Sequence, residues 1–276
     1  MSHPYVVVDA FSDRPLLGNP VAVIFEAGDL DAATMQRIAA ELQLSETTFV
    51  DDTTTPGEVR VRIFTPVNEL PLAGHPLIGT ARAWLDRTGH PAARFVTKRG
   101  PVEARREAAG SCVMSVTQPA PFVADFDQQD VVLGALGITG TPTPITLYDA
   151  GARHLLVQLP TPDELLALVP DQRALAVLED LAVNCFAVDG AGLMNRMFSP
   201  AYGVVEDAAT GSACAPLALH AIEHGLLPGD EIVSICQGEL LGKGCEMFVD
   251  VGAVAGGGAA ILSGATAVVA SGVLTV

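Results

Sequence analysis

Glu46 lies in the stretch ELQLSETTFV, where a helical pattern ends and a run of β-branched residues indicates a strand. A carboxylate beside a buried strand is costly unless it has partners. An apolar environment also raises the pKa of a carboxyl group toward the range in which it carries protons at neutral pH. Glu46 is therefore a candidate catalytic acid/base. The alternative, a solvated glutamate in a turn, is the commoner situation when these residues are considered alone.

Two turns that contain glycine precede apolar segments with helical spacing. AGHPLIGTA follows a loop that carries Glu69, and TGSACAPLA follows a loop that carries Glu206 and Asp207. The N-terminus of a helix presents unpaired N–H groups and a partial positive charge, which suit a carboxylate ligand. The turns therefore predict an anion site, unless both of them serve only to cap their helices.

Three polar side chains accompany these turns. His75 stands between Gly74 and Pro76 near a helix start, where an imidazole is biased toward neutrality and can donate or accept a hydrogen bond. In the second turn, Asp207 and Ser212 flank the sequence AATG. Serine and aspartate are ordinary cap residues, and for His75 taken alone a capping role is the favoured interpretation, so each candidate also has a purely structural interpretation.

The sequence does not favour a metal site. His220 and His224 in HAIEH match the H-x-x-E-H zinc motif, but Gly225 ends the helix at once, and histidines in a last turn interact favourably with the helix dipole without a metal. The cysteines are odd in number and lack a C-x-x-C pair, which predicts reduced thiols in a cytoplasmic protein. The cysteines are Cys112, Cys185, Cys214, Cys236 and Cys245.

Composition excludes some partners. The chain has 276 residues and a net charge of −17, with only 15 lysines and arginines from which to assemble a basic face, so a nucleic-acid partner is not expected. Hydrophobic residues make up 49% of the chain, which indicates a globular protein with a sizeable core. We find no signal-peptide pattern and no convincing membrane span.

The elements that must position the candidates alternate between strands and helices. YVVVDAF, NPVAVIFE, TTFV and VRVRIFT read as strands, LDAATMQRIAAELQL as a helix capped by Asp31, and HPLIGTARAWL as a buried helix. PVNELPLAG reads as a loop. The prolines of TQPAPF suggest a boundary near residues 118–122, hence lobes of 1–118 and 119–276. Whether a strand of about residues 266–276 returns to the first lobe is left open.

The second half repeats this order loosely, which is a weak internal repeat. We expect a helix in PDELLALVP, strands in LAVNCFAV, RMFSPAY, EIVSICQG and EMFVDV, a polar loop in GVVEDAATGSA and an apolar helix in CAPLALHAIEH. The glycines and the valine-rich alternation of the C-terminal tail suggest a hairpin.

The segments LSETTFV, RIFTPVNELPLAGHPLIGTA and MFSPAYGVVEDAATGSA together resemble the PhzF family of phenazine biosynthesis, and the resemblance covers essentially the whole chain. It implies an α/β diaminopimelate epimerase-like fold, in which two similar lobes each curl a β-sheet around a central helix and the active site lies between them. It also implies a homodimeric, cofactor-free isomerase that takes part in antibiotic biosynthesis and acts on a small molecule.

The resemblance further implies which residues do the chemistry. The family's namesake enzymes act on trans-2,3-dihydro-3-hydroxyanthranilate. On this resemblance Glu46 would move a proton from C3 to C1 while His75 and Asp207 orient the substrate. Substrate contacts are implied for Ser45, Gly74, Gly211 and Ser212. The epimerase relatives use two cysteines, but the first corresponding position here is Ala73 and the second is Ala208 or Ala209, which argues against two-thiol chemistry.

Two other functions remain open from the sequence. One is an isomerase or epimerase of another small amino or hydroxy acid that uses the same Glu46. The other is a non-catalytic protein that binds a metabolite or serves in an assembly. Loss of turnover with retained binding in Glu46→Gln would distinguish the enzymes from the binding protein.

Overall fold

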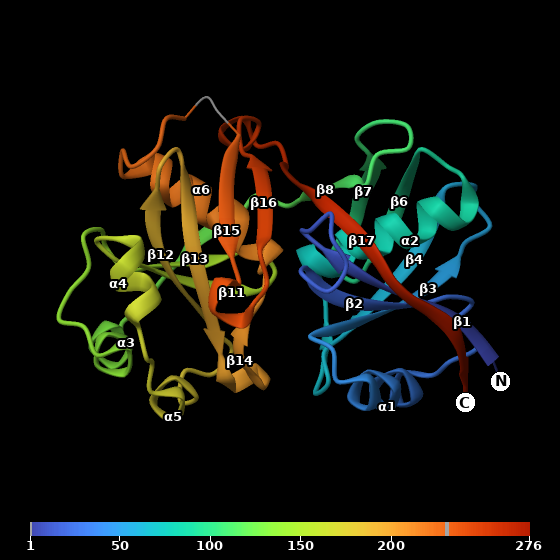
Figure 1. The fold of residues 1–276 in the computed structure, drawn as a ribbon, viewed down its shortest axis with the longest axis horizontal. Coiled ribbons are helices and arrows are strands. Elements are labelled where there is room, and N and C mark those ends of the chain that lie inside the picture. The colour runs from blue at the N-terminus through green and yellow to red at the C-terminus, as the bar shows by residue number, and fades with distance from the viewer. Residues whose placement is uncertain (1, 230–231) are drawn as a thin grey trace. The chain divides into compact units, whose positions relative to one another are not determined.

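The computed structural model describes residues 2–229 and 232–276, and it divides the chain into two compact units (Figure 1). The N-terminal unit comprises the residues up to Thr117 together with Ile261–Val276. The C-terminal unit comprises Gln118–Ala260. Among the described residues, no helix is both long enough and apolar enough to cross a bilayer.

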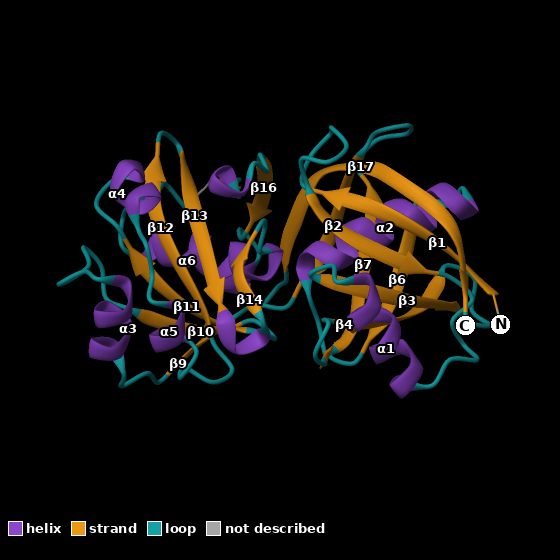
Figure 2. Ribbon diagram, turned by 60° about the horizontal axis from the view of Figure 1, so that its bottom comes forward, coloured by secondary structure: helices purple, strands orange, loops and turns teal. Residues whose placement is uncertain are grey.

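Strands of the N-terminal unit close into a barrel (Figure 2). They pair in the order β1–β2–β3–β4–β6–β7–β8–β17, and β17 pairs back to β1. The β2–β3 and β4–β6 pairs are parallel, and helices α1 and α2 lie in the respective crossovers. The elements of this unit are β1 (Ser2–Ala10), β2 (Asn19–Ile24), α1 (Ala32–Leu42), β3 (Glu46–Asp52), β4 (Glu58–Phe64), β5 (Glu69–Leu70), α2 (Gly74–Thr88), β6 (Ala92–Thr97), β7 (Gly100–Arg106), β8 (Val113–Gln118) and β17 (Ala260–Thr275).

Helix α2 forms the centre of this barrel. It contacts β1, β2, β3, β6 and β7, and it is buried along most of its length, as the sequence predicted. A Cβ atom at Gly79 would overlap Cγ1 of Val21, so glycine is what allows α2 to lie this close to β2. The helix ends at Gly89, which adopts the left-handed conformation with φ 74°.

Helix α1 lies in the crossover that connects β2 to β3. Its predicted N-cap is confirmed, because Oδ1 of Asp31 accepts from the Thr34 backbone N–H at 2.8 Å. Met35, Ile38 and Ala39 form its buried face, in the period expected for an amphipathic helix.

The C-terminal unit repeats this arrangement. Its strands pair in the order β9–β10–β11–β12–β13–β15–β16, the β11–β12 and β13–β15 pairs are parallel, and β14 adds to β13. Its elements are β9 (Phe122–Ala124), α3 (Gln129–Leu136), β10 (Thr146–Asp149), β11 (Arg153–Gln158), α4 (Pro162–Ala167), α5 (Gln172–Leu175), β12 (Ala182–Asp189), β13 (Gly192–Ser199), β14 (Val204–Asp207), α6 (Cys214–Glu223), β15 (Val233–Gln237) and β16 (Cys245–Asp250).

The predicted internal repeat is thus confirmed strand by strand. β1 to β7 of the N-terminal unit correspond to β10 to β16 of the C-terminal unit, with parallel pairs at the same two places. Helix α6 takes the place of α2 in the second crossover, and it is likewise mostly buried. Of the predicted strand EIVSICQG, Glu231 lies outside the described residues.

Three local predictions are wrong, at least in part. PVNELPLAG is not all loop, because Glu69–Leu70 forms β5 against β4. The C-terminal tail forms the single strand β17 rather than a hairpin, and it pairs with β1 from Ser2 opposite Thr275 to Ala10 opposite Thr266 (Figure 1). Its partner is at the other end of the chain, so local glycine content could not identify it. The segment GVVEDAATGSA is not all loop, because its first part forms β14 against β13.

Candidate active site

Glu46 is the first residue of β3, the strand that follows helix α1. It lies opposite Val21 in the parallel pair with β2, and its side chain is 16% exposed. The hydroxyl of the preceding Ser45 donates to Oδ1 of the fully buried Asn19 at 3.3 Å. The carboxylate is therefore held at the edge of the barrel core, with limited access to solvent.

His75 meets Glu46 from the start of α2. Its Nδ1 lies 3.2 Å from Oε2 of Glu46, and the residue is 4% exposed. Ala73, the N-cap, supplies no side-chain hydrogen bond to the first turn, and Gly74 opens the helix. The sequence-predicted residues Ser45, Glu46, Gly74 and His75 thus lie within the same end of the N-terminal barrel.

The imidazole of His75 is neutral at physiological pH. Burial lowers the pKa of His75 to about 3, although a hydrogen bond with the Pro20 backbone opposes the decrease. The distance to Glu46 would allow an ion pair with a protonated histidine. Because the ring is neutral, the contact with Glu46 is not an ion pair. The neutrality expected from the sequence is confirmed, with burial as its main cause.

Asp207, Gly211 and Ser212 lie together in the C-terminal unit, around the segment that leads into α6. Asp207 ends β14 and is 7% exposed, and its Oδ2 accepts from Oγ1 of Thr210 at 2.8 Å. Gly211 and Ser212 belong to the 3₁₀ turn before α6. Oγ of Ser212 is 3.0 Å from Nε2 of His154.

The repeat shows that the two units are not chemically equivalent. Thr47 lies opposite Phe64 in the N-terminal unit, and Val183 lies opposite Phe198 at the matching place in the C-terminal unit. Ala182 therefore occupies the position that corresponds to Glu46. The second unit has a methyl group where the first has a carboxylate, so the repeat does not provide a second acid/base at this position.

Sequence reasoning missed a set of buried polar residues on four neighbouring strands of the C-terminal unit. They are His154 on β11, Asn184 on β12, Asn195 on β13 and Gln237 on β15. Each is at most 1% exposed, and neighbouring members of the set are hydrogen-bonded to one another. An isolated amide inside an apolar strand, such as the asparagine of LAVNCFAV, was the signal that could have identified them.

Glu206 and Glu69 have structural partners. Arg196 donates to both carboxylate oxygens of Glu206 at 2.9 and 3.0 Å, and Arg62 does the same to Glu69 at 2.8 Å for each bond. The arginines occupy corresponding strands, β13 and β4. The two ion pairs therefore join corresponding strands in each repeat, and Glu206 faces a different partner from Asp207.

The histidines and thiol near α6 also have structural surroundings. Nε2 of the fully buried His220 lies 3.0 Å from Oγ1 of Thr143. Burial raises the pKa of the Cys214 thiol well above its usual range, so the thiolate needed for a nucleophile is disfavoured at neutral pH. Alanines stand at the positions that correspond to the two cysteines of the epimerase relatives, Ala73 in the first unit and Ala208 or Ala209 in the second.

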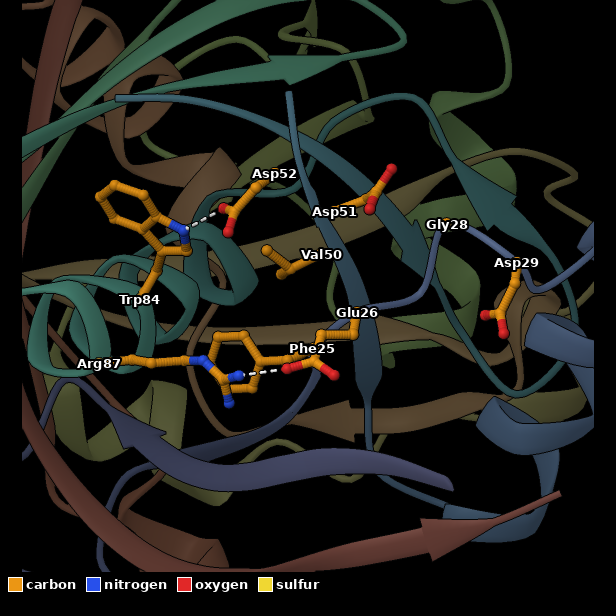
Figure 3. Close-up of a pocket in the computed structure, with 9 residues that line it drawn as sticks. All are labelled: Phe25, Glu26, Gly28, Asp29, Val50, Asp51, Asp52, Trp84 and Arg87. Atoms are coloured by element: carbon orange, nitrogen blue, oxygen red, sulfur yellow. Dashed lines mark hydrogen bonds and ion pairs between the residues drawn. The ribbon is translucent and has the colours of Figure 1, made fainter. Parts of the chain in front are cut away.

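A cavity of about 320 Å³ lies at the other end of β3, near its last residue Asp52 (Figure 3). Glu46 and Asp52 are about 20 Å apart at the usual rise per residue of a strand. In this cavity Nε1 of Trp84 donates to Asp52 at 2.8 Å, and Arg87 pairs with Glu26. None of the sequence-predicted site residues lines it, so it is distinct from the Glu46 region.

The paired repeats, each with a helix enclosed by strands, define the class of protein as a diaminopimelate epimerase-like α/β fold. Within that class, the family model of the phenazine biosynthesis-like proteins, PhzC-PhzF, matches residues 8–272. The chain belongs to this family.

Similar proteins cover nearly the whole chain. A Pseudomonas fluorescens protein named trans-2,3-dihydro-3-hydroxyanthranilate isomerase is 49% identical over 89% of this chain and 89% of its own. A Pseudomonas aeruginosa protein of the same name is 46% identical over 95% of this chain and 98% of its own. The solved structure of a predicted epimerase from Pseudomonas aeruginosa is 28% identical and matches with a TM-score of 0.87 over 99% of each chain.

Proposed function

We propose that this chain is an isomerase that converts trans-2,3-dihydro-3-hydroxyanthranilate by moving a proton from C3 to C1, with Glu46 as the acid/base. Relatives with this name are 46 to 49% identical over most of both chains. The observation that carries the mechanism is the contact between Glu46 and the neutral His75. It places a sparingly hydrated carboxylate beside an uncharged ring.

The proposed reaction is balanced without a cofactor. The carboxylate of Glu46 takes the proton from C3, and the electron pair of that C–H bond enters the ring π-system as the diene shifts. The resulting carboxylic acid returns the proton to C1. Because C3 carries the hydroxyl group, the product is an enol that settles to the ketone. One carboxylate positioned along one face of the ligand can serve both carbons.

The remaining residues have orienting roles in this proposal. His75 fixes the direction of the Glu46 carboxylate, and Asp207 pairs with the amino group of the substrate. Ser45 and Ser212 provide hydroxyl contacts to the substrate. Gly74 and Gly211 carry no side chain at the start of the segments that lead into α2 and α6, which allows their backbone N–H groups to approach the ligand.

The first test is incubation of the purified protein with trans-2,3-dihydro-3-hydroxyanthranilate in deuterated water, followed by NMR. We expect substrate consumption and deuterium at C1 whenever protonated Glu46 exchanges with solvent before it returns the proton. An inactive wild type would exclude this substrate. A screen of small amino and hydroxy acids would then test the epimerase function that the related epimerase structure suggests. Binding without turnover of any of them would favour a metabolite-binding protein.

We further propose that the protein is a cytoplasmic homodimer that works in antibiotic biosynthesis, with no nucleic-acid or membrane partner. The net charge of −17 supports the absence of a nucleic-acid partner, and the absence of a C-x-x-C pair supports a reducing compartment. Light scattering coupled to size-exclusion chromatography tests the dimer. A mass corresponding to one chain across the micromolar range would contradict it.

A further inference from the structure

We infer that His154 is a positioning residue for Ser212. A chain of buried amide side chains holds His154 in the tautomer whose proton is on Nε2, so that Ser212 accepts from His154 and directs its own hydroxyl proton to an acceptor oxygen of the ligand. The inference rests on the proposed function for the identity of the ligand. The tautomer is a property of the protein and can be tested separately.

The chain of hydrogen bonds begins at Gln237, whose amide orientation is determined by the backbone. Nε2 of Gln237 donates to the carbonyl of Asp207 at 2.9 Å, and a carbonyl can only accept. Oε1 of Gln237 accepts from the backbone N–H of Thr210 at 3.2 Å, and an N–H can only donate. Both contacts give the same orientation, so Oε1 of Gln237 is an acceptor.

Asn195 must then present its nitrogen to Gln237. Asn195 lies directly opposite Gln237 in the parallel pair of β13 and β15, with its Nδ2 2.8 Å from Oε1 of Gln237. The same nitrogen is 3.3 Å from Oδ1 of Asn184. The opposite amide orientation would bring Oδ1 of Asn195 against two acceptor oxygens. The assigned orientation is preferred even though Oδ1 of Asn195 then has no hydrogen-bond partner among the described residues.

The amide orientation of Asn184 determines the tautomer of His154. Nδ2 of Asn184 donates to the carbonyl of Ala182 at 3.1 Å, which fixes the amide independently of Asn195. The same nitrogen is 3.2 Å from Nδ1 of His154. Since Asn184 supplies the hydrogen, Nδ1 of His154 must accept it, and the ring proton of neutral His154 is on Nε2. The other tautomer would set two N–H donors against each other.

His154 remains neutral in this position. It is 1% exposed, and burial lowers the pKa of His154 to about 4, although the negative charge of Asp149 opposes the decrease. A cationic ring would also carry a proton on Nδ1 and would lose the hydrogen bond from Asn184. The amide chain and the burial therefore favour the same form of the ring.

Ser212 is the last residue in this series of hydrogen bonds, and it is only partly buried. Its Oγ accepts from Nε2 of His154 at 3.0 Å, and the part of the protein that the structure describes contains no other hydrogen bond to this hydroxyl. The Ser212 proton is then available for a carboxylate or hydroxyl oxygen of the ligand. An ammonium group has no lone pair to accept it, so this arrangement discriminates between the oxygen and nitrogen substituents of an amino acid.

NMR of the protein labelled with ¹⁵N in its histidines tests the tautomer without any substrate. Long-range ¹H–¹⁵N correlations at neutral pH should give His154 a protonated Nε2 and an unprotonated Nδ1, with the signals assigned by their loss in His154→Gln. A protonated Nδ1 on His154 would overturn the inference. This result holds whether or not the proposed substrate is turned over.

A double-mutant cycle tests whether His154 acts through Ser212. We expect His154→Phe to lower kcat/KM about 10-fold, the value of one good hydrogen bond. In the Ser212→Ala background the same change should have almost no further effect. His154→Gln, whose amide nitrogen lies near the position of Nε2, should restore part of the loss. Equal losses in both backgrounds would overturn the inference, because a structural defect would not require the Ser212 hydroxyl.

His220→Phe is the matched control for stability. His220 is equally buried in the same unit and also contacts a hydroxyl, that of Thr143, but it makes no hydrogen bond to the amide chain or to Ser212. We expect a similar decrease in Tm and unchanged kcat/KM. If His220→Phe reduced kcat/KM as much as His154→Phe, the role assigned to His154 would be rejected.

Discussion

Nδ1 of His75 lies 3.2 Å from Oε2 of Glu46, and burial holds the pKa of this histidine at about 3. A cationic partner would favour the carboxylate over the carboxylic acid and would oppose a group that must both take and return a proton. A neutral imidazole beside the carboxylate introduces no such bias. The pair therefore suits an acid/base that changes its protonation state during turnover.

Glu46→Gln should abolish turnover, because the amide cannot take the proton from the substrate. We expect kcat to fall by about 10³-fold or more, with Tm near that of the wild type. Glu26→Gln is the control for a surface glutamate in the same unit, since Glu26 pairs with Arg87 at the cavity near the other end of β3. Retention of more than a tenth of the activity in Glu46→Gln would contradict its assignment.

Substitutions of His75 should separate orientation from packing. His75→Leu removes the polar contact with Glu46, and we expect kcat to fall roughly 100-fold because the carboxylate loses its orientation. His75→Asn retains a polar nitrogen near the position of Nδ1 and should retain more activity at similar Tm. Stopped assays of both variants against wild type measure the difference, and equal activities would show that the contact with Glu46 is unimportant.

The buried histidines should make the protein less stable in mild acid. The pKa of His75 is lowered to about 3, and those of His154 and His220 to about 4, all mainly by burial. Below the ordinary histidine pKa of about 6.5 the unfolded chain binds protons that the folded chain does not, so stability is complete above this pH and is lost toward the folded values.

As the pH falls from about 6.5 toward the folded pKa values, each buried histidine should lower the free energy of unfolding by about 1.4 kcal/mol per pH unit. Urea unfolding between about pH 7 and about pH 5 measures this slope, and the range avoids most carboxylate titration. His154→Gln should give a shallower slope, by close to one proton. An unchanged slope in this variant would show that His154 is protonated in the folded protein.

The two arginine–glutamate pairs should differ in their importance for stability. Glu206→Gln leaves the positive charge of Arg196, whose side chain is 7% exposed, without its carboxylate, and we expect a loss of about 3–5 kcal/mol in the free energy of unfolding. Glu69→Gln should cost less, because the Arg62 side chain is 26% exposed and can be hydrated. Urea unfolding of both variants compares them, and a larger loss in Glu69→Gln would reverse the assignment.

Local patterns in the sequence were sufficient for many of the elements and for the main candidates. The period of Met35, Ile38 and Ala39 and the cap at Asp31 predicted helix α1, because helix periodicity and capping are properties of neighbouring residues. The glycine turns at Gly74 and Gly211, with Glu46 beside a strand, were visible for the same reason. The resemblance carried by these motifs supplied the family and the expected chemistry.

Tertiary structure decided what depends on partners far apart in the chain. Ser2 pairs with Thr275, so the tail became a barrel strand although its own composition suggested a hairpin. The neutral state of His75 depends mainly on burial, and the hydrogen bond between His154 and Ser212 depends on strands and turns that fold together. The sequence by itself thus determined which residues were available for chemistry, whereas only the folded chain decided their partners and protonation, because burial and hydrogen bonding arise from contacts that no local pattern contains.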